Sequence, residues 1–141
     1  MLVVTPTFNF SGHCEEAIHL YETAFNTKAD FILRYSDAKK EDWNVQLTDA
    51  QKNFVYHAEM KIGGQRLFFS DMISFEAAKG NFQFLTVTFE TKDEVQKARN
   101  VLADGGTILI PFRRTTYSSC AGNVIDKFGI RWGLMTEQTE R

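Results

Sequence analysis

Three polar side chains near the middle of the sequence could carry out acid–base chemistry together. His57 and Glu59 are two residues apart in the segment VYHAEMKI, and Ser70 lies in QRLFFSD, the segment that follows Gly63-Gly64. Residues two apart in a strand share one face, so Glu59 could orient the imidazole as a general base. The alternative is a cavity histidine that hydrogen-bonds Ser70 and has no catalytic role.

Two arginines are candidates for binding an anion on the same surface. Arg66 follows the Gly-Gly pair, and Arg131 has the corresponding place in DKFGIRWGLM, near the end of the chain. A guanidinium group suits carboxylate and phosphate because its N–H donors form a planar fork. In the alternative interpretation, both arginines pair with Glu59 across neighbouring strands.

These side chains are positioned by a pattern of elements that the sequence contains twice. The first copy reads as a strand in VVTPTFNF, a helix in HCEEAIHLYETAF, and strands in ADFILRYS, FVYHAEMKI and QRLFFSD. The second copy reads as a strand in FQFLTVTFE, a helix in TKDEVQKARNVLADGG, and strands in TILIPFRR and the hairpin GNVIDKFGIRWGLM. When the two copies are superposed, Phe10 matches Phe89 and Gly64 matches Gly129.

The repeat predicts the fold class and the domain organisation. We predict an α+β fold in which tandem βαβββ modules form an eight-stranded, cleft-enclosing mixed sheet. No linker separates the copies, so residues 1–141 are expected to form a single domain with modules at about 1–76 and about 81–136. Residues 137–141 are expected to be a short polar tail.

The alternation of apolar and polar residues predicts the face on which each strand residue lies. The side chains predicted to pack under the helices are Val4, Phe8 and Phe10 in the first module and Leu85, Val87 and Phe89 in the second. The Gly63-Gly64 turn sets the hairpin register, so that Glu59 opposes Phe68 and His57 opposes Ser70. The other surface is the expected ligand cleft, and its predicted residues are Thr7, Asn9, His57, Glu59, Arg66, Phe68, Ser70, Phe84, Thr86, Tyr117, Arg131 and Met135.

Composition and charge exclude several classes of partner. The 141 residues are 43% hydrophobic, and the 13 phenylalanines favour a thick core or an aromatic-lined cavity. The formal net charge of −2 and the lack of a basic stripe argue against nucleic-acid binding. The sequence has neither an apolar run of about 20 residues nor a leader-like N-terminus, so we expect no membrane association. Two cysteines make no disulfide framework, which favours a reducing cytoplasm.

The cysteines and the remaining histidines offer little further chemistry. Cys14 lies near the start of the first helix, where a lowered thiol pKa is a hypothesis, and Cys120 is expected to be a simple loop thiol. His13 and His19 are expected on the surface. Tyr117 and Cys120 lie in the loop after Pro111, and this loop is a candidate lid over the cleft.

Three segments in order resemble the PhnB-like branch of the vicinal oxygen chelate superfamily: FNFSGHCEEAIHLYETAF, VYHAEMKIGGQRLFFSD and VIDKFGIRWGLM. That superfamily includes glyoxalase I, extradiol dioxygenases and bleomycin-resistance proteins, and the branch is also labelled 3-demethylubiquinone-9 3-methyltransferase-like. The resemblance covers nearly the whole chain and implies the glyoxalase/bleomycin resistance fold. A Rossmann-type methyltransferase needs a glycine-rich turn between a strand and a helix, whereas the glycines here are expected at hairpins and helix ends.

The resemblance also identifies the positions at which a metal would be held. Catalytic members of the superfamily bind a divalent metal through His or Glu from four strands. Carried over one by one, these positions fall at Thr5 or Pro6, Phe68, Phe84 and Gly133. Of these side chains only that of Thr5 could hold a metal, and poorly. We therefore predict no metal and no other cofactor, with a displaced divalent metal as the disfavoured alternative.

Two functions remain open, and both use the predicted cleft. The first is a metal-free small-molecule binding protein, and the aromatic residues expected to line its cleft are Phe68, Phe84 and either Trp43 or Tyr117. The second is an enzyme of the lyase, isomerase or dioxygenase type, with His57 and Glu59 as acid–base groups or atypical metal ligands. A structural dimer module with a Phe-filled cleft is a third alternative. Exposed strand edges, and the resemblance to bleomycin-resistance proteins, favour a homodimer.

Overall fold

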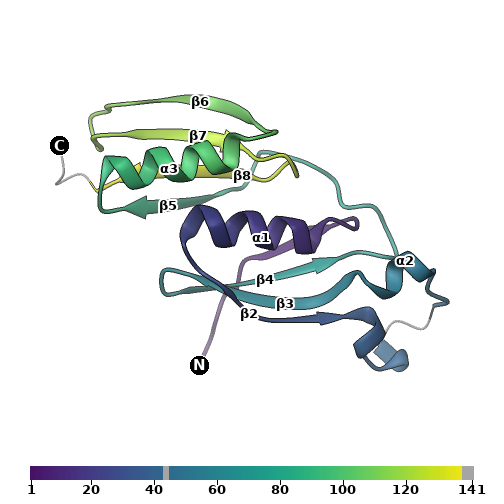
Figure 1. Cartoon of the computed structure of the whole chain (residues 1–141). Coiled ribbons are helices and arrows are strands. Elements are labelled where there is room, and N and C mark those ends of the chain that lie inside the picture. Colours follow the sequence, from purple (N-terminus) through teal and green to yellow (C-terminus); the bar gives the residue numbers. More distant parts are fainter. Residues whose placement is uncertain (43–44, 138–141) are drawn as a thin grey trace. The chain divides into compact units, whose positions relative to one another are not determined.

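The structure is a computed structural model that describes residues 1–42 and 45–137. The chain divides into two compact units, Met1–Ala77 and Ala78–Arg141, and each is described by itself. Each unit contains one βαβββ module with its own four-stranded mixed sheet (Figure 1). The predicted α+β fold of tandem βαβββ modules is therefore confirmed.

In the first unit, helix α1 (Cys14–Phe25) packs against two strands of the sheet, β3 (Val55–Ile62) and β4 (Gln65–Asp71). The strands are β1 (Thr7–Phe10), β2 (Ala29–Arg34), β3 (Val55–Ile62) and β4 (Gln65–Asp71), in the order β1-β4-β3-β2. β1 runs parallel to β4, and the other neighbours are antiparallel. The segment between β2 and β3, predicted as a loop, contains the short helical turns η1 (Tyr35–Asp37), η2 (Lys40–Asp42) and α2 (Asp49–Lys52).

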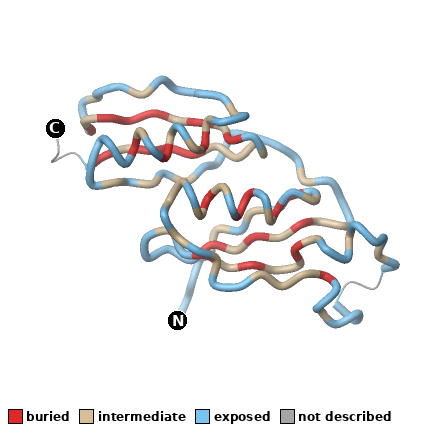
Figure 2. The backbone as a smooth tube through the Cα atoms, viewed as in Figure 1, coloured by how far each residue is buried: buried red, intermediate tan, exposed pale blue. Residues whose placement is uncertain are grey.

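The buried side chains of α1 meet the buried side chains of the first sheet. Ala17, Ile18 and Tyr21 on α1 are fully covered, and the Tyr21 ring centroid lies 6.0 Å from that of Phe69 on β4. Burying one large apolar side chain contributes about 1.5–3 kcal/mol, so this contact is a main source of stability in the unit. Figure 2 shows red, buried segments along α1 and along the central strands β3 and β4.

The predicted inward face of β1 is confirmed for two of its three residues. Phe10 is 4% exposed, and the Phe8 ring packs edge-on against the ring of Phe69 on β4. The prediction is wrong for Val4, which is 79% exposed. The pairing of β1 with β4 begins only after Pro6. The Pro6 carbonyl oxygen accepts a hydrogen bond from the Phe68 N–H, but proline has no N–H to donate in return.

The second unit repeats this arrangement. Its strands are β5 (Leu85–Phe89), β6 (Thr107–Arg113), β7 (Ala121–Ile125) and β8 (Arg131–Thr136), in the order β5-β8-β7-β6. Helix α3 (Lys92–Ala103) begins at a capping box between Thr91 and Glu94, and it packs against β5, β7 and β8. Its fully buried residues are Val95, Ala98 and Leu102. None of the helices in the described ranges has both the length and the apolar character to cross a membrane.

The face parity predicted for the second module is confirmed. Leu85, Val87 and Phe89 are half-buried, whereas Thr86 and Thr88 between them are exposed. The half-buried residues oppose buried residues of β8, which contacts α3. The exposed residues of β5 therefore lie on the face of the sheet away from the helix.

The two sheets repeat each other residue by residue. Phe10 opposes Asp71 at the end of the β1–β4 pair, and Phe89 opposes Thr136 at the end of the β5–β8 pair. The predicted superposition of Phe10 on Phe89 is thus confirmed by the strand register. Positions of the first module can therefore be compared directly with positions of the second.

Asp71 ties three segments of the first unit together. Its carboxylate is 1% exposed and accepts hydrogen bonds from the backbone N–H groups of Gly12 (2.7 Å), Cys14 (3.1 Å) and Val55 (2.9 Å). These groups belong to the turn before α1, to the start of α1 and to the start of β3. A buried carboxylate is tolerated when its oxygens are hydrogen-bonded, and here those bonds position the strands of the site.

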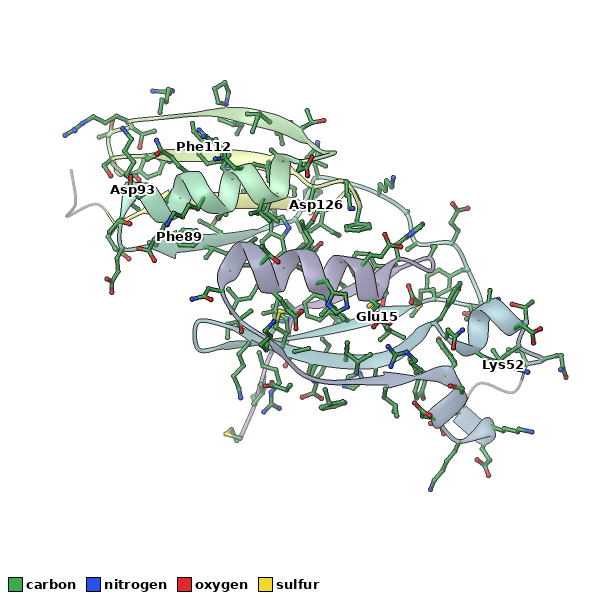
Figure 3. The ribbon with its side chains drawn as sticks, in the orientation of Figure 1. Glu15, Lys52, Phe89, Asp93, Phe112 and Asp126 are labelled. Carbon is green, nitrogen blue, oxygen red and sulfur yellow. The ribbon has the colours of Figure 1, made fainter. Side chains whose placement is uncertain are left out.

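Asp126 has a comparable role in the turn between β7 and β8 (Figure 3). Its carboxylate accepts hydrogen bonds from the N–H groups of Phe128 (2.9 Å) and Ile130 (3.0 Å) and from Nε1 of Trp132 (3.0 Å). Gly129 has φ +90°, a conformation that glycine adopts without strain. The Asp-x-x-Gly segment therefore sets where β8 begins.

We predict that replacing Asp71 by Asn lowers the free energy of unfolding by about 2–4 kcal/mol, because one acceptor oxygen becomes an amide that opposes a buried N–H group. Chemical denaturation of both proteins measures the difference. Asp49→Asn is the matched control, since the Asp49 side chain is fully exposed and its Oδ1 lies 3.5 Å from Nζ of Lys52; this variant should unfold at nearly the same denaturant concentration as the wild-type protein. Equal losses for the two variants would contradict the role given to Asp71.

Candidate functional site

The first sheet has one face covered by α1 and one face turned away from it, here called the first open face. Its residues alternate along each strand with the buried ones, and they oppose one another on neighbouring strands across the sheet. They include the predicted site residues Thr7, Asn9, His57, Glu59, Arg66, Phe68 and Ser70, together with Phe31, Leu33 and Lys61. The predicted opposition of Glu59 and Phe68 is confirmed.

His57 lies between a carboxylate and two aromatic rings. Its Nε2 is 2.8 Å from Oε2 of Glu59, and its ring centroid is 4.8 Å from that of Phe68 and 5.9 Å from that of Phe31. The His57 side chain is 36% exposed and that of Glu59 is 19% exposed. Among the described residues His57 bonds Glu59 and shows no hydrogen bond to Ser70, whose hydroxyl donates to Oδ1 of Asn9 at 2.9 Å on the neighbouring strand.

The two arginines have different partners. Nε of Arg66 is 3.7 Å from Oε1 of Glu59, so the pairing predicted for Arg66 is confirmed. Arg131 has its partners in its own unit instead: Nε donates to Oδ1 of Asn123 at 2.7 Å, and Nη1 donates to the carbonyl oxygen of Asn81 at 2.9 Å. Asn123 opposes Gly133 as Glu59 opposes Phe68, so an amide occupies the place that the carboxylate has in the first sheet.

The second sheet has a corresponding second open face, formed by Phe84, Thr86, Asn123, Arg131, Gly133 and Met135. The guanidinium carbon of Arg131 lies 3.7 Å from the centroid of the Phe84 ring. A Cβ at Gly133 would lie 3.1 Å from that ring and 2.8 Å from the Thr86 hydroxyl oxygen. The glycine therefore allows Phe84 to lie close over the sheet beneath the arginine.

The side chains at the four positions carried over from catalytic relatives do not fit a divalent metal. Phe68 packs on the His57 ring, Phe84 packs under a guanidinium group, and Gly133 has no side chain. Thr5 precedes β1, and its carbonyl oxygen accepts a hydrogen bond from the Thr7 hydroxyl. Within residues 1–42 and 45–137, no three His, Cys, Asp or Glu residues are grouped so that they could hold a metal ion.

Several glycines depart from the predicted pattern: Gly122 lies inside β7, Gly133 lies inside β8, and Gly12 lies between a strand and a helix. Gly12, at φ +105°, joins β1 to α1, so the expectation that the glycines serve hairpins and helix ends is wrong there. Its N–H is donated to Asp71, and a Cβ at this position would lie 2.9 Å from the Phe54 ring. The turn is therefore occupied by groups of the protein itself, which gives no support for a methyltransferase cofactor site.

Both thiols are buried. Burial, with the nearby charges of Asp71 and Glu15, raises the pKa of the Cys14 thiol well above its usual range, so the hypothesis of a lowered pKa is wrong. Cys120 precedes β7 as expected but is 3% exposed, which is not the environment of a simple loop thiol. Tyr117 is 52% exposed, and its role as a lid stays a prediction.

Some of the predicted residues lie away from the open faces, and others were missed. His13 and His19 are exposed, as expected, and each contacts a glutamate of α1. Trp43 lies outside the described residues. Sequence reasoning missed Phe31 and Asn123, although the alternation of ADFILRYS places Phe31 on one side of its strand and the internal repeat places Asn123 opposite Gly133.

A family model described as 3-demethylubiquinone-9 3-methyltransferase matches residues 3–135. Among solved structures, protein PA1353 from Pseudomonas aeruginosa is 24% identical with a TM-score of 0.84, over 97% of this chain and 98% of that chain. The PhnB protein from Bacillus cereus is 28% identical with a TM-score of 0.76, over 96% and 99%. The fosfomycin resistance protein FosX from Listeria monocytogenes is 12% identical with a TM-score of 0.64, over 99% and 96%, which shows a shared fold alone.

Proposed function

The chain belongs to the 3-demethylubiquinone-9 3-methyltransferase family, and we propose that it is a binding protein for a small organic molecule, which packs on the first open face. The observation that carries this proposal is the cluster of Phe31, His57 and Phe68, whose rings approach one another on one side of the sheet. Ligand sites are largely apolar surfaces with a few polar groups that set the orientation. The rings would contact a planar apolar part of the ligand.

Polar groups at the edge of this cluster would hold the other end of the ligand. Glu59 is bonded to His57 on one side and paired with Arg66 on the other, so acceptor and donor groups alternate along the face. The hydroxyl of Ser70 and the amide of Asn9 are joined at 2.9 Å farther along the same face. A ligand with both hydrogen-bond donors and acceptors would fit this arrangement.

The half-exposed aromatic surface supplies the favourable free energy for binding. Phe31 is 46% exposed, and the His57 side chain is 36% exposed. Removing apolar surface from water contributes about 25 cal/mol per Å², so covering about 100 Å² would contribute about 2.5 kcal/mol. The polar groups would then select among planar molecules rather than provide most of the affinity.

We predict that Phe68→Ala weakens the binding of naphthalene-1-carboxamide, a neutral planar probe, about 5- to 30-fold. The expected loss is about 1–2 kcal/mol, because the probe would lose one of its stacking partners. Titrations followed by NMR give the affinity from the resonances of the first open face.

Phe75→Ala is the matched control for this titration. Phe75 belongs to the same unit but is 59% exposed outside the strands, so its removal should leave the affinity unchanged. Equal effects of the two substitutions, or wild-type affinity in a folded Phe68→Ala variant, would overturn the proposal.

A second candidate function is acid–base catalysis, and the 2.8 Å contact between His57 and Glu59 favours it. A carboxylate at that distance can orient an imidazole for proton transfer, and the two side chains could also be atypical metal ligands.

If the chain is a metal-free binding protein, elemental analysis of the purified protein should find far less than one zinc, nickel, iron or manganese ion per chain. A single metal per chain that is lost in His57→Ala would favour the enzyme instead.

A further inference from the structure

The second open face holds an arginine in a fixed position by contacts with neutral groups. Asn123 accepts from Nε of Arg131 at 2.7 Å, the Asn81 carbonyl oxygen accepts from Nη1 at 2.9 Å, and the guanidinium carbon lies 3.7 Å from the Phe84 ring centroid. Ion pairs were found for other arginines, but within residues 78–137 no carboxylate lies within ion-pair distance of Arg131. Its positive charge is therefore positioned without being neutralised in this unit.

In the first sheet the arginine at the corresponding position, Arg66, has its charge neutralised by a carboxylate. Arg66 stands two residues before Phe68, as Arg131 stands two residues before Gly133. The residue opposite Phe68 is Glu59, whose carboxylate pairs with Arg66 at 3.7 Å. In the second sheet the corresponding residue is an asparagine, which lies closer to its arginine, at 2.7 Å, but adds no negative charge.

We propose that Arg131 is the binding residue for a small organic oxyanion, of the carboxylate or phosphate type, on the second open face. This inference goes beyond the function proposed for the first open face. A guanidinium group has five N–H donors. The hydrogen bonds to Asn123 and to the Asn81 carbonyl oxygen use two of these donors. The remaining donors form charge-assisted hydrogen bonds of the kind that oxyanions accept.

The surroundings of Arg131 suit this role. The Phe84 ring and the two hydrogen bonds hold the guanidinium group in place, so little side-chain freedom would be lost when an anion binds. The Phe84 ring lies close over Gly133, two residues along β8 on the same face, and the Thr86 hydroxyl opposite Gly133 is a further hydrogen-bond donor. An oxyanion would thus meet one fixed positive charge and one hydroxyl group.

The test compares naphthalene-1-carboxylate with its neutral isostere, naphthalene-1-carboxamide. We expect the wild-type protein to bind the carboxylate about tenfold more tightly, as read from the Arg131 Nε–H and Gly133 amide resonances in NMR titrations. Asn123→Asp changes the shape of the side chain very little but places a carboxylate against Arg131, so this variant should lose the preference. Arg131→Met should lose it as well.

Arg99→Met is the matched control, because Arg99 belongs to α3 of the same unit and its guanidinium carbon lies 5.7 Å from the Phe112 ring centroid. This variant should keep the preference for the carboxylate. Equal affinities of the wild-type protein for the two probes, or a preference that persists in Asn123→Asp, would overturn the inference. Binding of the probe to the first open face is followed by the resonances of that face. A failure of the proposed function would therefore show as unchanged resonances there, independently of the Gly133 amide.

Discussion

The register of β4 against its two neighbours is the constraint on which the site of the first unit depends. Side chains of a strand alternate between faces, so a shift of one residue would exchange Phe68 and Arg66 for the buried residues beside them. The Gly63-Gly64 turn sets this register at one end of the hairpin, where Gly63 has φ +59°. At the other end Asp71 fixes it, since its carboxylate bonds the start of β3 and the turn before α1.

The second unit uses the same backbone frame with different side chains. Thr136 stands where Asp71 stands, and its hydroxyl accepts the Ser119 N–H at 3.0 Å near the start of β7. With the frame preserved, residues on the open faces differ without a change of fold. One face therefore has an aromatic cluster around a neutralised arginine, and the other has an arginine over Phe84.

The fold and the face parity could be predicted because they depend on local patterns. The internal repeat, the Gly-Gly turn and strand alternation are all visible in neighbouring residues, and each was confirmed by the strand register. The partners of Ser70 and the exposure of Val4 were not predictable in this way, because they depend on which strand lies beside them. The raised pKa of Cys14 follows first from burial of the thiol and then from the carboxylate of Asp71, which is far away in the sequence. The homodimer and the cytoplasmic location stay predictions.

If the ring cluster of the first open face binds the planar part of a small molecule, a bound planar probe must lie against those rings. Intermolecular nuclear Overhauser effects between bound naphthalene-1-carboxamide and the protein measure this proximity. We expect effects between the probe and the ring protons of Phe31, His57 and Phe68. Effects confined to the exposed rings of Phe75 and Phe82, or to side chains on the α1 face of the sheet, would contradict this expectation.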